Sequence, residues 1–197
     1  MFKADFVAND THEDLYFLPP EIAIVAPTFN ERDNVIALKN LIADALKGRA
    51  WELIFVDDDS TDGTFDAVLA ESRRDPRVRI IRRVGRRGLA TAVVEGILST
   101  TAPMVAVIDA DMQHDERVIP DMIARMKQQN VDLVIGSRYV NGGGVGEWDA
   151  KRQTISRIAT DISRLVVKAD LTDPMSGFFL IRRKAFDSAV RNLSGQG

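Results

Sequence analysis

The sequence contains no cysteine and only two histidines. Without cysteine the chain has neither a disulfide framework nor thiolate-bound zinc. His12 and His114 belong to no pattern for nucleophilic catalysis, so we expect both to be structural or exposed. No basic segment followed by an apolar one stands at the start, and no apolar run approaches the roughly 18–20 residues that cross a bilayer. We therefore expect a soluble, cytoplasmic chain.

The charge of the chain is nearly balanced. Lys and Arg total 26 against 29 for Asp and Glu, which gives a net charge of −3 with both signs mixed and predicts no nucleic-acid partner. With 197 residues, 45% of them hydrophobic, the chain is long enough to bury one sizeable core. We expect a flexible lead-in over 1–20 and one domain over 21–197.

Short β-branched segments alternate with longer helical patterns along the chain. This alternation predicts an α/β fold with three layers, in which helices cover both faces of a mostly parallel sheet. The strand segments are apolar almost throughout, as expected for strands that are buried on both sides. Strands are predicted at 22–26, 52–56, 77–81, 104–108, 132–135 and 178–181, and helices at 33–47, 64–73, 88–99, 117–129 and 150–168.

Two features stand near the end of the chain. Residues 141–146 contain four glycines and predict a flexible loop near a ligand. The sequence stops at Gly197 after a helical pattern with no closing element, so we expect the domain to be truncated at its C-terminus.

The motif at 109–113 reads Asp-Ala-Asp-Met-Gln and directly follows an apolar segment. In an extended segment, residues i and i+2 point to the same side, so Asp109, Asp111 and Gln113 are predicted to converge on one point. Their oxygen atoms suit Mg²⁺ or Mn²⁺, ions that commonly keep waters and bridge substrate phosphates. The alternative is a solvated turn in which Asp115 and Glu116 cap the next helix. The motif alone leaves both interpretations open.

The segment Pro-Thr-Phe-Asn-Glu at 27–31 follows the first predicted strand. Pro27 and Phe29 can form a wall for a planar ring, and Glu31 can accept a hydrogen bond from a base or a sugar hydroxyl. The alternative is a local role, in which Asn30 caps the next helix and Glu31 favours the positive N-terminus of that helix.

Three successive acids end the second predicted strand. Asp57, Asp58 and Asp59 repel one another unless cations or hydrogen-bond donors offset them, and a nucleobase N–H or a ribose hydroxyl is such a donor. The alternative is a solvated turn in which Asp62 or Thr64 caps the next helix. Both interpretations can hold, because only one or two of the acids need to face a ligand.

Two basic segments are candidates for binding anions. Residues 82–89 place four arginines beside two glycines, so guanidinium and backbone groups there can approach a diphosphate or a base. Arg138, Lys151 and Arg152 can form an anion site for an acceptor phosphate, helped by a helix N-terminus. The alternatives are a solvated arginine run and a surface cluster in which Trp148 is a packing anchor.

The order and spacing of these motifs are more specific than any one of them. The motifs are Pro27-Thr-Phe-Asn-Glu31, Val56-Asp-Asp-Asp-Ser60 with Asp62-Gly-Thr64, Gly88-Leu89, Asp109-Ala-Asp111-Met-Gln113-His114, Gly136-Ser-Arg-Tyr139 and Asp173-Pro-Met-Ser-Gly177. Together they resemble family 2 glycosyltransferases of the GT-A fold. The resemblance covers about residues 21–187. It is closest to the polyprenyl-phosphate branch, which includes dolichol-phosphate mannosyltransferases and bacterial bactoprenol glucosyltransferases.

The resemblance implies a site for a nucleotide-sugar donor. A Mg²⁺ or Mn²⁺ ion on the donor diphosphate is expected to be held by Asp109, Asp111 and Gln113. The catalytic residues expected are Asp111 together with Arg138 and Arg152, which would engage an acceptor phosphate. The residues expected to bind the nucleotide are Pro27, Phe29, Glu31, Asp57, Asp58, Arg86, Gly88, Asp109 and Ala110. Asp59 stands where the family commonly has Asn, so we assign no specific contact to it.

The acceptor that the resemblance implies is a polyprenyl (dolichyl or undecaprenyl) phosphate. Relatives that act on soluble glycans carry a later acidic residue as base and a Gln/Arg-rich motif, and this chain has neither. A phosphate needs no base, because its second pKa of about 6 leaves it largely a dianion at neutral pH. We expect inverting transfer from a UDP- or GDP-linked sugar. In the full-length protein this would take place at the cytoplasmic face of a membrane, which a region absent from this chain would contact.

Two alternatives remain for the function. The same fold can act on a glycan or protein hydroxyl, or it can be a non-catalytic module that binds nucleotide sugars. Intact Asp109, Asp111 and Gln113 argue against the second. A phosphoacceptor receiver domain also places acids at strand ends, but it gives no reason for the Gly-Ser-Arg and Asp-Pro-Met-Ser-Gly segments.

Overall fold

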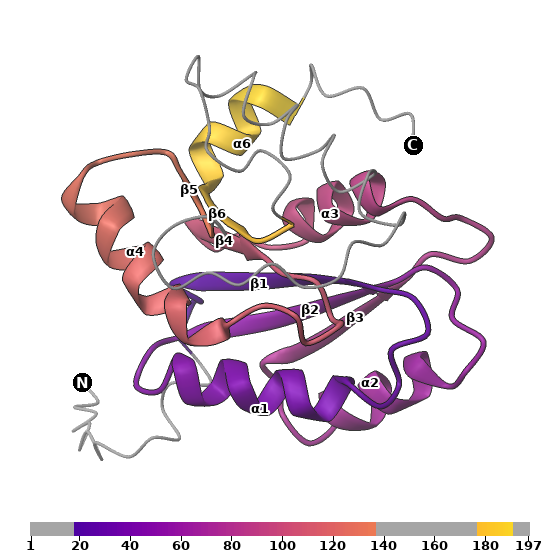
Figure 1. The fold of residues 1–197 in the computed structure, drawn as a ribbon. Helices are drawn as coiled ribbons and strands as arrows, with labels where there is room; N and C mark the ends of the chain where they lie inside the picture. Colours follow the sequence, from indigo (N-terminus) through magenta and orange to yellow (C-terminus); the bar gives the residue numbers. More distant parts are fainter. Residues whose placement is uncertain (1–17, 137–176, 191–197) are drawn as a thin grey trace, which may run out of the picture.

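The computed structural model describes residues 18–136 and 177–190, in which a sheet lies between two layers of helices (Figure 1). The strands are β1 (Ile22–Thr28), β2 (Trp51–Asp57), β3 (Val78–Arg82), β4 (Met104–Val107), β5 (Leu133–Ile135) and β6 (Phe179–Arg182). The helices are α1 (Val35–Ala45), α2 (Thr64–Ser72), α3 (Leu89–Leu98), α4 (Ile119–Gln128) and α6 (Arg183–Ala189). The predicted α/β fold class is confirmed, and each predicted strand is present within a few residues of its expected bounds.

The strand order in the sheet is β3-β2-β1-β4-β6-β5. The pairs of β1 with β2, β1 with β4 and β2 with β3 are parallel, as the alternation of strands and helices predicted. β6 runs antiparallel to both of its neighbours, β4 and β5. The sheet is therefore mostly parallel, and its one reversed strand comes from the last described segment of the chain.

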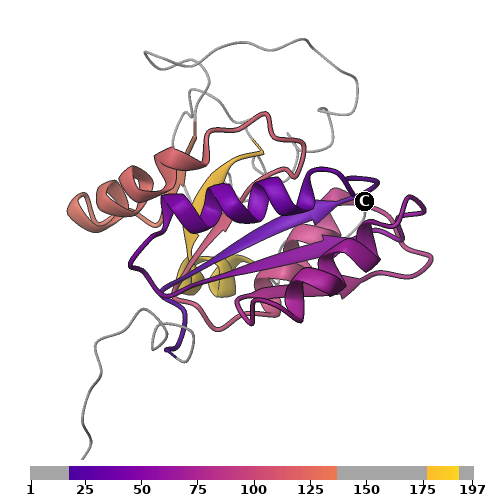
Figure 2. The same ribbon diagram turned by 90° about the horizontal axis from the view of Figure 1, so that it is seen from below.

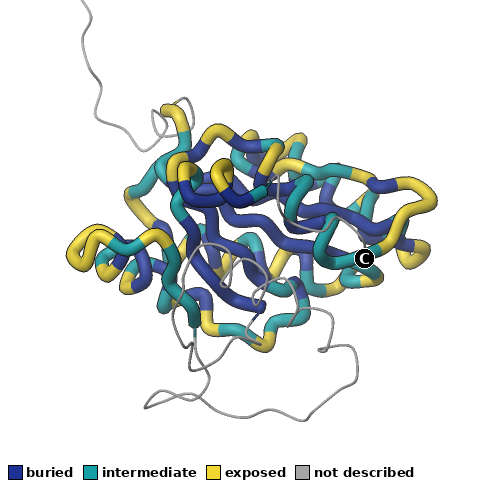
Figure 3. The backbone as a smooth tube through the Cα atoms, turned by 90° about the horizontal axis from the view of Figure 1, so that it is seen from above, coloured by how far each residue is buried: buried dark blue, intermediate teal, exposed yellow. Residues whose placement is uncertain are grey.

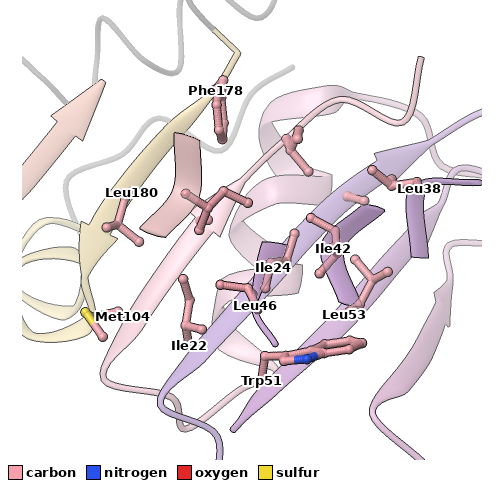
Figure 4. Close-up of a cluster of buried hydrophobic side chains, with 14 of the residues drawn as sticks. Ile22, Ile24, Leu38, Ile42, Leu46, Trp51, Leu53, Met104, Phe178 and Leu180 are labelled. Carbon is pink, nitrogen blue, oxygen red and sulfur yellow. The ribbon is translucent and has the colours of Figure 1, made fainter. Parts of the chain in front are cut away.

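Alternate residues of the strands build two separate cores. In β1, Ile22 and Ile24 face a cluster formed with α1, α2 and α4, part of which Figure 4 shows. Ala23 and Val25 face the opposite cluster, formed with α3 and α6. In the view from below, α1 crosses the first face of the sheet (Figure 2). The buried strands are the dark blue centre of the molecule in Figure 3. Burial on both faces explains why these strands are apolar throughout.

The predicted helix at 117–129 begins differently from our expectation. A 3₁₀ turn, η2 (Glu116–Val118), comes first, and α4 starts at Ile119 with Pro120 in its first turn. Proline is tolerated there because the N–H that it lacks has no partner inside the helix. The predicted helix at 150–168 and the glycine-rich segment 141–146 lie outside the described residues. Among the helices of the described ranges, none has the length and apolar character needed to cross a membrane.

Helix α3 lies unusually close to the sheet at Gly96. A Cβ atom added to Gly96 would clash with a methyl group of Val25 and would come within 3.0 Å of a methyl carbon of Val56. The helix therefore packs against β1 and β2 through a position where any side chain would be too large.

We predict that Gly96→Ala lowers the free energy of unfolding. Alanine favours a helix over glycine by about 1 kcal/mol, but overpacking a core typically destabilises by about 1–3 kcal/mol, so the net change is a loss. Urea unfolding measures it, and adding Val25→Ala to Gly96→Ala should recover part of the loss by removing the clashing methyl. A variant as stable as the original protein would show that α3 can shift away from the sheet.

Candidate active site

The loops that carry the predicted site residues meet at one edge of the sheet. Because β1, β2 and β4 run parallel, their carboxyl ends point to the same edge, the usual position of ligand sites in open α/β sheets. Thr28 is paired with Asp57 at the ends of β1 and β2, and the Asp58 N–H donates to the Thr28 carbonyl at 3.0 Å. The first two acidic and polar turns are thus held side by side.

The turn after β1 is locked to the turn after β2. Asn30 adopts a positive φ of 57°. Its N–H donates to Ser60 Oγ at 2.8 Å, and its Oδ1 accepts from the Thr61 N–H at 3.0 Å. The alternative that Asn30 caps α1 is therefore wrong, because the N-cap position is Asn34. The Glu31 carboxylate accepts a hydrogen bond from Asn34 Nδ2 at 2.6 Å.

Asp58 anchors the loop between β3 and α3. Its Oδ1 accepts from Arg83 Nη1 at 2.6 Å, and its Oδ2 accepts from the Gly88 N–H at 2.8 Å. The Arg83 side chain is only 2% exposed, and it also donates to the Gly88 carbonyl and the Thr91 hydroxyl. Its Nε lies 3.4 Å from a Glu95 carboxylate oxygen. Asp58 and Gly88, which we expected at the nucleotide, thus have structural partners, and the buried Arg83 was not singled out from the sequence.

The other two acids of the 57–59 turn differ in their partners. Asp59, at a positive φ of 59°, pairs with Arg82 at 3.1 Å and accepts from the Gly85 N–H at 3.3 Å. Asp57 accepts from the Ser60 N–H at 3.2 Å through Oδ2, while its Oδ1 is buried without a hydrogen-bond partner. Within the described ranges, Asp57 is therefore the acid of this turn that no arginine offsets.

The remaining predicted nucleotide contacts from this side of the edge fall into three environments. Phe29 is half-buried, and the exposed Arg87 places its guanidinium carbon 4.1 Å from the centre of the Phe29 ring. Arg86 is bound to Glu95 through two hydrogen bonds of 2.6 and 3.1 Å. Pro27 is buried within β1. The sequence predicted a ring at Phe29 but not the Arg87 guanidinium over it.

The acidic motif after β4 is a turn and not an extended segment. β4 ends at Val107, and Met112 has a positive φ of 63°. The turn brings the Asp111 carboxylate back to the Gln113 N–H, which donates to its Oδ1 at 3.1 Å. The extended geometry that we predicted for this motif is therefore wrong.

The donor set of this turn suits a divalent cation. Asp109 and Asp111 are half-buried and Gln113 is exposed, and among the residues that the structure describes neither carboxylate is paired with Lys or Arg. Two carboxylates that lack a basic partner, together with an amide oxygen, are ligands that suit Mg²⁺ or Mn²⁺. The described part of the chain holds no group of three or more His, Cys, Asp and Glu side chains arranged for a metal, so further ligands would be Gln113, waters or a phosphate.

The residues that follow the motif also have the local role that we weighed. Asp115 Oδ1 accepts from the Arg117 N–H at 3.1 Å and from Arg117 Nε at 2.8 Å, at the N-cap of η2. The hydrogen bond from the Arg117 guanidinium holds the pKa of Asp115 below its ordinary value. Ala110 is 3% exposed, with its side chain in the core, so only its backbone can face a ligand. The capping alternative is thus confirmed for Asp115 but not for Glu116, whose buried Oε1 has no hydrogen-bond partner within the described ranges. In the same ranges, Asp109 and Asp111 remain unpaired with Lys or Arg.

The predicted acceptor site is not among these contacts. Arg138 and Arg152, together with Lys151 and Trp148, lie outside the described residues. The predicted donor-side residues therefore lie on four loops, which follow β1, β2, β3 and β4 at one edge of the sheet.

The chain is similar to known proteins over most of its length. Residues 23–189 match the family model described as glycosyl transferase family 2. The chain is 38% identical over 177 residues to the dolichol-phosphate mannosyltransferase of Pyrococcus furiosus, an alignment that covers 89% of this chain and 50% of that protein. It is 32% identical over 182 residues to the dolichol-phosphate mannosyltransferase of Saccharomyces cerevisiae, covering 90% and 67%. The chain thus spans half to two thirds of the length of these relatives.

Two solved structures illustrate the likeness of the fold. The mannosyltransferase PcManGT from Pyrobaculum calidifontis, in complex with GDP-Man and Mn²⁺, has a TM-score of 0.59 at 17% identity, covering 88% of this chain and 47% of that one. Glucosyl-3-phosphoglycerate synthase from Mycobacterium tuberculosis, in complex with Mn²⁺, UDP-Glc and phosphoglyceric acid, has a TM-score of 0.58 at 19% identity, covering 91% and 63%. These structures confirm the GT-A architecture, and with the family match over residues 23–189 the chain belongs to glycosyl transferase family 2.

Proposed function

We propose that this chain transfers a sugar from a nucleoside-diphosphate sugar to a polyprenyl phosphate, with inversion and with Mg²⁺ or Mn²⁺ as cofactor. The observation that carries the proposal is the set of acids without Lys or Arg partners at one edge of the sheet, Asp57 after β2 and Asp109 and Asp111 after β4, within the described ranges. A nucleotide-sugar donor with its metal ion supplies the N–H groups and the positive charge that these acids lack.

The names of the relatives support a finer proposal. Curated relatives at 32–38% identity are dolichol-phosphate mannosyltransferases, and one structural neighbour holds GDP-Man. We therefore propose mannose as the sugar, a GDP-linked donor and a dolichyl-type phosphate as the acceptor. Because that lipid lies in a membrane, we propose that the full-length protein acts at a membrane face.

The donor would be divided among three loops. Phe29 offers a ring on which a base can stack. Asp57 Oδ1, which is buried without a hydrogen-bond partner in the described ranges, would accept from a base N–H after the turn opens to expose it. Asp58 and Arg83 act indirectly, because they fix the loops around the base. Asp109, Asp111 and Gln113 would hold the divalent ion, which when bound offsets negative charge on the departing diphosphate.

The chemical step does not need a carboxylate of the protein as a general base. A lipid phosphate oxygen attacks C1 of the sugar and forms the new O–C1 bond, while the C1–O bond to the donor diphosphate breaks. The nucleoside diphosphate leaves with that electron pair, and the configuration at C1 inverts. Because the attacking phosphate is largely a dianion, no proton has to be removed first. Arg138 and Arg152 are proposed to hold this phosphate in line, which is a positioning contribution.

A transfer assay tests the proposal against its alternatives. GDP-mannose and UDP-glucose are each offered with Mn²⁺ to the full-length protein, together with dolichyl phosphate, dolichol or a soluble glycan. Sugar transfer to dolichyl phosphate alone supports the proposal. Transfer to a hydroxyl acceptor would establish the alternative transferase, and metal-dependent nucleotide binding without transfer or donor hydrolysis would establish a binding module.

We predict that Asp111→Asn abolishes metal-dependent nucleotide binding. The amide keeps the side-chain volume and a carbonyl oxygen but removes the negative charge that favours the ion. Calorimetric titration with GDP and UDP, each with and without Mn²⁺, measures the effect. Asp121→Asn, on the exposed first turn of α4, is the matched control and should leave binding unchanged. Unchanged affinity in Asp111→Asn would remove this residue from the metal site.

We also predict that Phe29→Leu weakens nucleotide binding about 5- to 100-fold, because stacking of a base on an aromatic ring contributes about 1–3 kcal/mol. Binding of inorganic pyrophosphate with Mn²⁺ should not change, since it has no base. Phe65→Leu is the control, because the guanidinium carbon of Arg82 lies 4.9 Å from the centre of the Phe65 ring, much as that of Arg87 lies over Phe29. An equal loss with pyrophosphate would contradict a stacking role.

A further inference from the structure

His114 makes the one side-chain contact recorded for the Asp109 carboxylate in the described part of the chain. His114 Nε2 lies 3.5 Å from Asp109 Oδ2, and the two side chains are 13% and 19% exposed. In the tautomer that carries its proton on Nε2, His114 donates to this carboxylate. The imidazole is thus a neighbour of a proposed metal ligand.

The His114 ring is itself held by an aromatic neighbour. Its centroid lies 5.3 Å from that of Phe178, with the two planes inclined at 39°, a distance typical of interacting aromatic pairs. Phe178 is 3% exposed and belongs to the main core cluster, at whose edge Figure 4 shows it. The ring that supports His114 is therefore packed in the core, on a different segment of the chain from the acidic turn.

Phe178 in turn sits on a glycine. A Cβ atom added to Gly136 would lie 2.5 Å from Phe178 Cδ1, and the Gly136 N–H donates to the Phe178 carbonyl at 2.9 Å. Gly136 directly follows β5, Phe178 directly precedes β6, and His114 follows the turn after β4. Three separate segments thus converge on the imidazole.

We infer that His114 is a positioning residue for the divalent metal: it orients the Asp109 carboxylate, and Phe178 holds the imidazole in the required place. The inference rests on the proposed function, in which Asp109 and Asp111 are metal ligands. Partners of this kind fix the orientation of ligating groups, and losing one typically lowers metal affinity by about 10- to 100-fold.

The contacts of the two carboxylates support this assignment. Asp111 receives a hydrogen bond on Oδ1 from the Gln113 N–H, and Asp109 meets His114 through Oδ2. Each carboxylate has one oxygen engaged by a nitrogen, and within the described ranges the other oxygen has no hydrogen-bond partner and can face an ion. The partner of Asp111 is a backbone group of the same turn, whereas Asp109 depends on a side chain that needs support from elsewhere.

Substitutions at position 114 separate the hydrogen bond from the ring packing. His114→Phe keeps a ring against Phe178 but removes the N–H, so the Mn²⁺ concentration for half-maximal GDP or UDP binding should rise about 10- to 100-fold. His114→Gln keeps an N–H donor without the ring, and it should lose less affinity than His114→Phe. Metal affinity is read from the signal of free Mn²⁺ in electron paramagnetic resonance, so no turnover is required.

Two adjacent phenylalanines provide a matched pair for the second half of the inference. Phe178 and Phe179 are both 3% exposed, but they belong to the two clusters on opposite faces of the sheet. Both Leu variants should lose similar stability on unfolding, whereas Phe178→Leu alone should weaken Mn²⁺ binding. In the His114→Phe background, Phe178→Leu should have little further effect on Mn²⁺ affinity, because the N–H that it positions is already gone.

The possible outcomes distinguish this inference from the proposed function. If the original protein binds no nucleotide in a metal-dependent way, the proposed function fails and the inference fails with it. If the original protein binds and His114→Phe binds Mn²⁺ equally well, only the positioning role is overturned. The positioning role is also overturned if Phe178→Leu and Phe179→Leu weaken Mn²⁺ binding equally, since the effect is then one of general stability.

Discussion

The parallel pairing of β1 with β2 and β4 is the constraint on which the rest of the site depends. It brings the acids that follow β2 and β4 to one edge of the sheet, where like charges at close range raise the free energy of the fold. At this edge each acid either is paired with an arginine or can face a cation from outside the chain. Arg83 and Arg82 offset Asp58 and Asp59, which leaves Asp57 and the 109–111 turn.

The buried Arg83 gives this distribution its rigidity. The Arg83 side chain is 2% exposed, and its two terminal nitrogens donate to the β2 turn, to the following loop and to the start of α3. Its Nε has no hydrogen-bond partner within the described ranges and lies 3.4 Å from a Glu95 carboxylate oxygen. The loop from Val84 to Arg87 is exposed and emerges between these fixed ends. Arg87 reaches Phe29 from this exposed loop, and its guanidinium carbon lies 4.1 Å from the centre of the Phe29 ring.

Much of the fold followed from the sequence because its signals are local. Apolar strand segments and helical periodicity predicted the strands and most helices, and turn residues predicted which loops carry the acids. Two features depended on tertiary contacts and escaped prediction. Nothing in the run of arginines distinguishes Arg83 from its neighbours, because burial is decided by what packs around it. The motif at 109–113 was expected to be extended, whereas Met112 adopts a positive φ. Residues other than glycine rarely adopt this conformation.

The direction of β6 explains how a distant segment reaches the proposed metal turn. β6 pairs antiparallel with β4, with Val107 opposite Phe179, so the amino end of β6 lies beside the carboxyl end of β4. A parallel strand in the same position would present its last residue, near Arg182, at this edge. Reversal instead places Phe178 there, and because β5 is also antiparallel to β6, the carboxyl end of β5 brings Gly136 to the same point. The one reversed strand of the described sheet therefore supplies the ring on which His114 rests.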